Sequence, residues 1–402
     1  MKTQIGNTLI SANAKVVRTV NRSMILNLIR EKQPISRIQI ARTTGLNKST
    51  VSSIVSHLLQ EGLIFQEAHP DSNVGRTPIN LCLKLGSNFV GAINIDSPVS
   101  RVAIADIDGS LKESVTLDTI PDPPAEFVTR CVQELFVLRD RLKIRHFKGI
   151  GVSVAGIVDP DKARVVFAPR LGWEDFDIGA TLKQLCPREG TITVDNDSRA
   201  SALAELWYGR HELGISNFVF LTVGPGIGTG IVVNRNVIHG NSHASGEFGH
   251  MTLFEGGELC SCGNHGCWEA YASDRATVRR YLMRKQQDPS SESVLLLDII
   301  DRARSGDEVA RDILIQTGHY LGMGMANIIK AIDPEAIIIG GRITAAWEIV
   351  YPEIMSTLHK RAFFGKQRNI RILPTSLDVR PRLLGAGTLA LKELFRDFRI
   401  TR

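Results

Sequence analysis

The sequence predicts an α/β protein in which an N-terminal winged helix-turn-helix module precedes two α/β lobes that face a cleft. Three observations support this fold class. The 402 residues correspond to about two or three domains. All the excess positive charge lies in the first fifth of the chain. After Asn88, strand hairpins, helices and single strands alternate in two rounds.

The composition is typical of a globular protein. Hydrophobic residues make up 43% and charged residues 22% of the chain, which is too apolar for a disordered chain. No apolar run reaches the roughly 18 residues that a membrane span requires. The first residues also lack the compact apolar core of a signal peptide. We therefore expect a cytoplasmic protein without a membrane segment.

The charge divides the chain into two functional parts. Residues 1–80 contain ten Lys or Arg and four Asp or Glu, whereas residues 81–402 contain 38 of each sign. A basic module joined to a neutral body predicts that the module binds a polyanion and that the body has a different task. A solvated basic face without a partner is the alternative.

Three helices are predicted in the basic module. Apolar residues recur at three- and four-residue steps from Val16 to Arg30, which is typical of an amphipathic helix. Ser36 can cap a second helix that closes at Gly45, and Asn47 can cap a third that runs to Gly62. Two helices around a Gly-containing turn form the helix-turn-helix pattern.

The third helix is the predicted DNA-reading element, because its polar side chains face away from its apolar ones. Small hydroxyls and a lysine suit base edges and phosphates in a major groove. The residues concerned are Lys48, Ser49, Thr50, Ser52 and Ser53. Two strands, at 63–65 and 79–85, would form a wing whose Arg76 enters a narrow, A·T-rich minor groove. A three-helix protein-interaction module is the alternative.

A cysteine-rich loop is the sharpest local signal. Cys260, Cys262 and Cys267 fall within eight residues, and His250 precedes them by ten. Three thiolates and one imidazole complete a tetrahedral zinc shell, so we expect structural zinc; a catalytic site would keep one position open. His265 is a competing imidazole. Disulfides are the alternative, disfavoured because cytosolic thiols stay reduced.

Three carboxylates, Asp197, Glu247 and Glu269, lie near this loop or at a strand end. Such acids can accept hydrogen bonds from hydroxyl groups or act as a base towards a hydroxyl nucleophile. Each taken singly is also explained as a surface or capping acid, so their role depends on whether they converge.

These motifs together resemble the ROK family (repressor, open reading frame, kinase), and within it the regulator branch that includes the xylose and N-acetylglucosamine repressors. The most specific motifs are Gly-Glu-Phe-Gly-His at 246–250 and Cys-Ser-Cys-Gly-Asn-His-Gly-Cys-Trp-Glu at 260–269. Ile35-Ser36-Arg37, Thr44-Gly45-Leu46 and Gly75-Arg76 look like the winged helix of that branch. The resemblance covers nearly the whole chain.

The resemblance implies an actin-like kinase fold of two ribonuclease-H-like lobes with a sugar in the cleft. Residues 1–85 would be the DNA-binding domain, residues 86–195 with about 375–402 the first lobe, and residues 196–374 the second lobe with the zinc loop. The sugar ligands carried over by motif are Asn196, Asp197, Glu247, His250 and Glu269, and Asp197 occupies the position of the kinase base. The metal ligands would be His250, Cys260, Cys262 and Cys267, with zinc stiffening the loop that carries the sugar acids.

The departures from the family pattern concern phosphate binding. The kinase loop Asp-x-Gly-Gly-Thr-Lys is replaced by Asp-Ser-Pro-Val-Ser-Arg at 96–101, in which Pro98 has no N–H. The second phosphate loop reads Gly-Pro-Gly-Ile-Gly at 224–228 and lacks the usual Thr. Arg170 stands where the family usually has Asn. We therefore expect no catalytic residue, Asp197 being a vestigial base position, and a body that binds a sugar without phosphorylating it.

The sequence thus predicts a sugar-responsive transcriptional repressor of carbohydrate-utilisation genes. Its partners would be an operator in double-stranded DNA, a sugar or sugar-phosphate effector, and further copies of the chain in a homodimer or homotetramer, because paired half-sites require a two-fold protein. An active sugar kinase with an appended DNA-binding module is one alternative. A regulator controlled by protein docking, with a vestigial sugar pocket, is the other.

Overall fold

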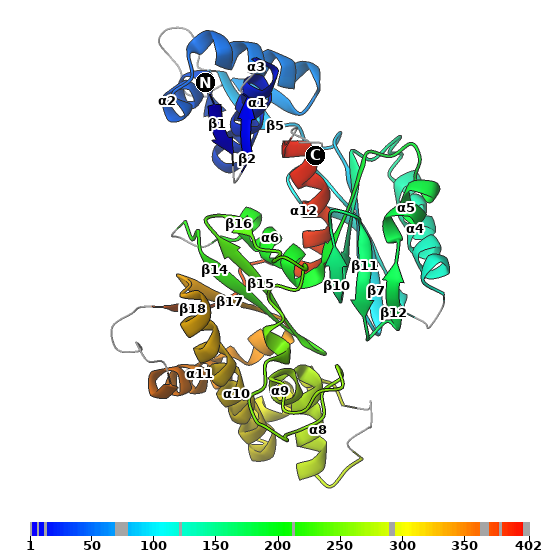
Figure 1. Cartoon of the computed structure of the whole chain (residues 1–402), viewed down its shortest axis with the longest axis vertical. Helices are drawn as coiled ribbons and strands as arrows, with labels where there is room; N and C mark the ends of the chain where they lie inside the picture. The colour runs from blue at the N-terminus through cyan, green and yellow to red at the C-terminus, as the bar shows by residue number, and fades with distance from the viewer. Residues whose placement is uncertain are drawn as a thin grey trace.

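The computed structural model describes residues 2–5, 8–11, 14–68, 79–119, 123–210, 214–288, 294–361, 370–377 and 380–396, with side chains from residue 16 onward except Ala68. The chain forms an N-terminal domain and two lobes, each built on its own five-stranded sheet (Figure 1). The predicted fold class is confirmed.

The N-terminal domain has the predicted helix-turn-helix. Its helices and strands are α1 (Ala14–Lys32), β3 (Ile35–Ser36), α2 (Arg37–Thr44), α3 (Lys48–Gln60), β4 (Ile64–Ala68) and β5 (Ile79–Leu83). Ser36 caps α2 in a capping box with Gln39, and Gly45 ends that helix with a φ of 71°. Asn47 caps α3 by accepting a hydrogen bond from the Thr50 N–H. Gly45 at the end of α2 and Asn47 at the start of α3 therefore bound the turn between these helices.

The wing is an antiparallel pair of strands, β4 and β5, to which β3 adds a third strand. The turn between β4 and β5, and Arg76 with it, lies outside the described residues. A further strand pair, β1 (Lys2–Ile5) and β2 (Thr8–Ser11), precedes α1 and was not expected from the sequence.

The first lobe is built on a sheet with the order β13-β9-β6-β7-β8. Its strands are β6 (Val90–Ile95), β7 (Val99–Ala105), β8 (Leu111–Asp118), β9 (Gly149–Val154) and β13 (Thr191–Asn196). β6, β7 and β8 are antiparallel, whereas β9 runs parallel to both β6 and β13. Helices α4 (Pro124–Arg141) and α5 (Ile178–Leu185) and a small sheet of β10 (Ile157–Asp159), β11 (Arg164–Ala168) and β12 (Trp173–Phe176) complete it.

The second lobe repeats this topology, with the order β16-β15-β14-β17-β18. Its strands are β14 (Phe218–Val223), β15 (Ile227–Val233), β16 (Asn236–Val237), β17 (Ala336–Gly340) and β18 (Arg371–Pro374). Its helices are η1 (Phe248–His250), α7 (Glu269–Ala272), α8 (Asp274–Arg284), α9 (Leu296–Arg304), α10 (Glu308–Ile332), η2 (Arg342–Ala346) and α11 (Trp347–Arg361). The two predicted rounds of hairpin, helix and strand are these two sheets.

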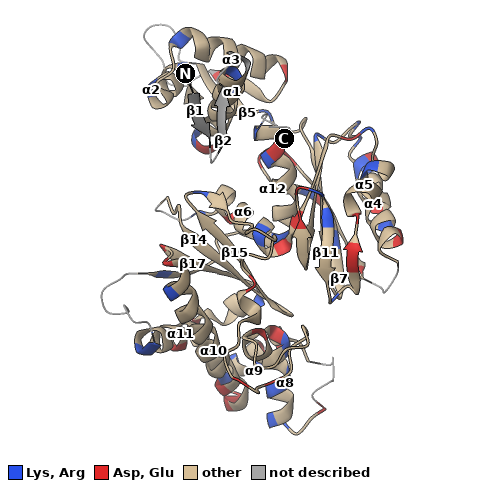
Figure 2. Ribbon diagram, viewed as in Figure 1, with Lys and Arg blue, Asp and Glu red and all other residues tan. Residues whose placement is uncertain are grey.

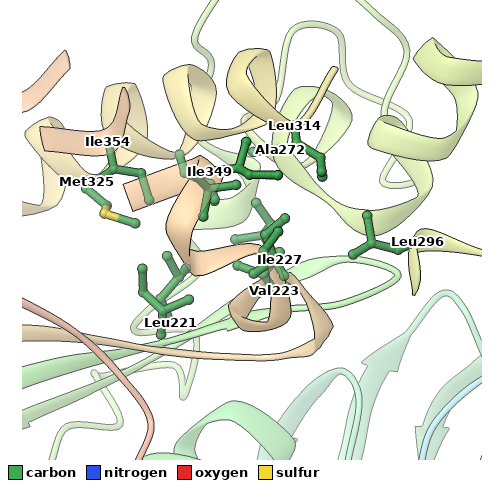
Figure 3. Close-up of a cluster of buried hydrophobic side chains, with 14 of the residues drawn as sticks. Leu221, Val223, Ile227, Ala272, Leu296, Leu314, Met325, Ile349 and Ile354 are labelled. Carbon is green, nitrogen blue, oxygen red and sulfur yellow. The ribbon is translucent and has the colours of Figure 1, made fainter. Parts of the chain in front are cut away.

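The core of the second lobe lies between its sheet and its helices. Side chains from β14, β15, α7, α9, α10 and α11 meet in one buried cluster (Figure 3). Trp268 belongs to this cluster and is fully buried, and a Cβ on Gly324 of α10 would collide with its ring. This packing anchors the start of α7, and with it the cysteine-rich loop, to the lobe.

Two helices, α6 (Asp197–Tyr208) and α12 (Pro381–Arg396), pack against each other and link the lobes to the N-terminal domain (Figure 1). Their backbones come so close that a Cβ on Gly385 would meet the backbone of Ala200. At the end of α12, Leu391 and Phe395 join the hydrophobic core of the N-terminal domain. The same two helices therefore border the cleft at one end and α1 at the other.

Figure 2 shows basic and acidic residues on the outer helices of both lobes. Among the described helices, none combines the length and the apolar character needed to cross a membrane.

Candidate functional site

A cavity of about 350 Å³ lies between the lobes. It takes its walls from the first lobe, from the N-terminus of α6 and from the β14–β15 turn, η1 and cysteine-rich loop of the second lobe. The polar side chains that line it are Arg170, Asn196, Asp197, Ser198, Thr229, Glu247, His250, Ser261, Glu269 and Arg382. All five of the expected sugar ligands are among them.

Asn196 and Asp197 meet the cavity at the start of α6. The Asn196 Oδ1 caps α6, accepting from the Ser198 N–H (2.9 Å) and the Arg199 N–H (3.0 Å), while its Nδ2 donates to the Gly156 carbonyl (2.9 Å). Asp197 is 6% exposed, and burial raises the pKa of its carboxyl. Asn196 therefore has a structural role as the cap of α6.

Glu269 and Glu247 border the cavity from the second lobe. The Glu269 carboxylate accepts from the Ile227 N–H (2.9 Å) and from the Ser261 hydroxyl (2.8 Å), which fixes its orientation. The Glu247 side chain is 39% exposed, and its partly desolvated position raises the pKa of its carboxyl. With Asp197, the three acids converge on one cavity, so each is more than an isolated surface acid.

Two glycines of the β14–β15 turn make room for these side chains. A Cβ on Gly226 would collide with the Glu269 carboxylate, and a Cβ on Gly228 would collide with the Ser198 hydroxyl. The Gly residues in this turn are therefore explained by close side-chain approach.

His250, Cys260, Cys262 and Cys267 form a cluster whose ligand atoms all lie within 4.8 Å of one another. His250 Nδ1 lies 3.6 Å from Cys260 Sγ, and Cys262 Sγ lies 3.7 Å from Cys267 Sγ. Tetrahedral zinc with bonds of about 2.3 Å to sulfur separates its ligands by about 3.8 Å, so these four residues fit a metal ion. His265, the competing imidazole, instead places its Nδ1 3.0 Å from the Gly257 carbonyl oxygen.

His250 faces both the cysteines and the cavity. Its Nδ1 points to Cys260, while its Nε2 lies 3.9 Å from Glu247 Oε2. Ser261, between two of the cysteines, donates to Glu269. A metal ion held here would thus stiffen the segment that orients both Glu247 and Glu269.

An ion-pair network that no sequence motif indicates closes the other side of the cavity. Arg382, near the start of α12, pairs with Asp96 of the first phosphate loop and, through Nε at 3.2 Å, with Asp197. Arg170 pairs with the same Asp96 at 3.0 Å and donates to the Ser97 carbonyl at 2.5 Å. No motif surrounds Arg382 in the sequence, and about 185 residues separate it from Asp197, so only the fold reveals the contact.

The second phosphate loop, residues 224–228, has few backbone donors to offer. The Gly224 N–H donates to the Gly226 carbonyl (2.9 Å), the Ile227 N–H donates to Glu269, and Pro225 has no N–H. Phosphate cradles depend on several converging backbone N–H groups. In this loop the Gly224 and Ile227 N–H groups are thus engaged within the protein.

The candidate DNA-binding residues lie on one side of α3, opposite its buried residues Val51, Ile54, Val55 and Leu58. Lys48, Ser49 and Ser53 are exposed, and Thr50 and Ser52 are half-buried. The Ser49 hydroxyl donates to Asn47 Oδ1 (2.8 Å), so it also reinforces the cap of α3.

Comparisons with known proteins agree with this architecture. The ROK family matches residues 90–393, and the MarR family matches residues 18–72. The xylose repressor of Bacillus spizizenii (strain ATCC 23059 / NRRL B-14472 / W23) is 31% identical over 394 residues, covering 95% of this chain and 97% of that protein. The DNA-binding transcriptional dual regulator NagC of Escherichia coli (strain K12) is 27% identical over 385 residues, covering 94% and 93%.

Solved structures of ROK family proteins have a similar fold. A ROK family transcriptional regulator, a homologue of the E. coli MLC protein, superimposes with a TM-score of 0.81 at 25% identity, covering 95% of this chain and 97% of that one. A ROK family glucokinase from Streptomyces griseus, in complex with glucose and AMPPNP, superimposes with a TM-score of 0.66 at 28% identity, covering 76% of this chain and all of that one.

The fold and the cavity define a class of protein, a two-lobed body of sugar-kinase type joined to a helix-turn-helix domain. The match to the ROK family extends over residues 90–393, so this chain belongs to that family. The expected resemblance is confirmed.

Proposed function

We propose that this protein is a sugar-responsive, DNA-binding transcriptional repressor of carbohydrate-utilisation genes that acts in the cytoplasm. Its body binds a sugar or sugar phosphate without phosphorylating it, and Asp197 is a vestigial base position. The observation that carries this proposal is Arg382, whose guanidinium bridges Asp96 and Asp197. The ion pair with Arg382 engages the Asp197 carboxylate, which is the group at the position of the kinase base.

The relatives support the regulatory part of this proposal. The xylose repressor and NagC match over at least 93% of their own lengths, so the N-terminal domain is included in the likeness. The glucokinase supports the sugar-binding part, since its structure contains glucose. The alternative of an active kinase is not favoured, because the relatives that match the whole chain are named as regulators.

We infer the sugar ligands and the metal from the residues that line the cavity and its cysteine-rich loop. Asn196, Asp197, Glu247, His250 and Glu269 bind the sugar hydroxyls. The metal is structural zinc on His250, Cys260, Cys262 and Cys267, because four protein ligands leave no open position. Zinc would fix the ligand loop and would not activate water.

We propose the same domain boundaries as from the sequence: residues 1–85, residues 86–195 with about 375–402, and residues 196–374. The DNA-reading residues are Lys48, Ser49, Thr50, Ser52 and Ser53, and Arg76 would enter an A·T-rich minor groove. A homodimer or homotetramer supplies the paired helices that two half-sites require.

The test uses the full chain in three measurements. Calorimetric titration with pentoses, hexoses, N-acetylhexosamines and their phosphates identifies the effector, and fluorescence anisotropy on DNA selected from a random pool measures operator binding with and without it. A coupled assay with magnesium-ATP measures phosphoryl transfer. We expect saturable sugar binding that changes DNA affinity, with no transfer above background.

Asp197→Asn provides the control that separates sensor from kinase. Phosphoryl transfer by the wild-type protein that disappears in Asp197→Asn would show an active kinase and contradict the proposal. DNA release that follows addition of a partner protein but none of these sugars would instead establish the docking alternative.

A further inference from the structure

The two lobes give the sugar cavity walls of different polarity. The second lobe lines it with acids, Glu247 and Glu269. The first lobe lines it with apolar residues and one arginine, Arg170. The apolar residues of this wall are Ala155, Gly156, Ile157, Phe167 and Pro169. A bound molecule therefore meets hydrogen-bonding groups from one lobe and an apolar surface from the other.

Phe167 of β11 is the largest side chain of this apolar wall, and much of it is open to solvent. It is 43% exposed, whereas Val165 and Ala168 of the same strand are fully buried in the core of the first lobe. Ile157 of β10 lies opposite Phe167 in the antiparallel pair of strands and also lines the cavity. Phe167 thus keeps apolar surface in contact with water that a ligand in the cavity can cover.

Close backbone contacts fix the apolar wall relative to the start of α6. A Cβ on Gly156 would lie 2.6 Å from the Phe167 carbonyl oxygen, so a glycine is needed where the chain entering β10 approaches β11. The Gly156 carbonyl in turn accepts a hydrogen bond from Asn196 Nδ2 (2.9 Å). Asp197, which follows Asn196, and Phe167 therefore line the same cavity in a fixed arrangement.

We propose that Phe167 is a specificity-determining residue of the sugar cavity, whose ring packs against a C–H face of a pyranose. In a pyranose the equatorial hydroxyls point outward from the rim of the ring, while C–H groups cover its two faces. The rim can then reach the acids of the second lobe while one face covers Phe167, so that both kinds of surface are matched. This inference rests on the proposed function, because it names the class of sugar that the cavity binds.

The test compares sugars that differ in the orientation of one hydroxyl. The full chain is titrated calorimetrically with D-xylose, D-glucose and N-acetyl-D-glucosamine, whose non-anomeric ring substituents are all equatorial. The tightest of the three is then compared with its C3 and C4 epimers. The C3 epimer has an axial hydroxyl on one face of the ring, and the C4 epimer has one on the other face. Whichever face packs on Phe167, one epimer places a hydroxyl against the phenyl ring without a hydrogen-bond partner and should bind more weakly.

Phe167→Ala removes the ring, Phe167→Tyr retains it, and Val166→Ala is the matched control. Val166 precedes Phe167 in β11 and is 41% exposed, but it is not among the described residues that line the cavity. In Phe167→Ala we expect the Kd of the tightest sugar to rise about five- to tenfold, the scale set by the apolar area that the ring covers. The Kd of the disfavoured epimer should rise less, so the ratio of epimer Kd to sugar Kd falls. Phe167→Tyr and Val166→Ala should keep the wild-type ratio.

The ratio of Kd values is the decisive measurement, because it does not depend on the fraction of folded protein and a purely structural role would not change it. The inference is overturned by an unchanged ratio in Phe167→Ala, by an equal change in Val166→Ala, or by a wild-type protein that binds none of the three sugars. The proposed function is tested separately by the wider sugar series and the operator measurements. Sugar-dependent DNA binding together with an unchanged ratio in Phe167→Ala would therefore contradict this inference alone.

Discussion

Asp274 is a buried acid whose protonation is linked to stability. It caps no helix, and burial raises the pKa of its carboxyl to about 7, although Arg342 and Arg382 oppose the shift. The folded protein therefore binds this proton more tightly than the unfolded chain. The resulting stability is fully present below about pH 4 and is lost as the pH rises towards 7.

Asp274→Asn removes this contribution, because the amide resembles the neutral acid. We expect the free energy of unfolding of the wild type, measured by urea titration at several pH values, to fall from pH 4 to 7 more steeply than that of the variant. At pH 8 the variant should be the more stable of the two. Identical slopes would show that Asp274 has an ordinary pKa.

Gly228 tests whether the β14–β15 turn is shaped by side-chain contacts. Gly228→Ala places a methyl group against the Ser198 hydroxyl, and such overpacking costs about 1–3 kcal/mol. We expect a lower free energy of unfolding by urea denaturation, partly restored by adding Ser198→Ala. Gly214→Ala is the control, since a Cβ there meets no atom within 4 Å. Equal effects at the two glycines would contradict this account.

At the residue scale, local spacing predicted the cluster of His250 with the three cysteines but not the ion pairs. The cysteines and His250 lie within 18 residues, so sequence proximity limits where their side chains can go. Arg382 reaches Asp96 only because α12 packs on the first sheet, and nothing in the local sequence encodes that contact. Asn196 belongs to a recognisable sequence motif. Its role as the cap of α6 depends on where that helix begins, which the motif does not show.

The cysteine-rich loop lies against the acids of the cavity, since Ser261 donates to Glu269. In Cys262→Ser we expect a loss of about one zinc ion per chain, measured by mass spectrometry, because the hydroxyl is a poor zinc ligand. Sugar affinity should fall as well, since Ser261 and His250 then no longer hold Glu269 and Glu247 in place. Cys82→Ser, which changes an isolated cysteine of β5, should keep both the metal and the affinity.

Zinc loss without any change in sugar affinity would show that the metal does not influence sugar binding in the cavity. The metal would then stabilise only the loop. Unchanged zinc content in Cys262→Ser would instead remove this residue from the ligand set.

At the element scale, helices with clear caps were predicted well and glycine-rich ones were not. Ser36, Gly45 and Asn47 gave the boundaries of α2 and α3 directly. In contrast, α10, which runs from Glu308 to Ile332, carries glycines in its interior. Its glycines disfavour a helix in isolation, but Gly322 and Gly324 allow close packing against Thr357 and Trp268. Tertiary packing of this kind has no local signal.

At the scale of the whole molecule, α6 and α12 join the cavity to the DNA-binding domain. Asp197 at the start of α6 and Arg382 at the start of α12 line the cavity. At the other end, the Ser23 hydroxyl of α1 donates to the Phe395 carbonyl (2.7 Å). A ligand that alters the Asp197–Arg382 pair thus acts on two helices that both contact α1.

Arg30 of α1 is the contact through which this coupling can be tested. Its guanidinium lies 4.1 Å from the centroid of the Trp207 ring in α6 and donates to the Trp207 carbonyl (3.2 Å). In Arg30→Met we expect sugar and operator each to bind as in the wild type, while the factor by which sugar changes operator affinity shrinks towards one. Coupling between two ligands is reciprocal, so the effect of operator on sugar affinity, measured by calorimetry, must shrink equally. Arg145→Met, an exposed change in the first lobe, should leave both factors intact; full coupling in Arg30→Met would exclude this route.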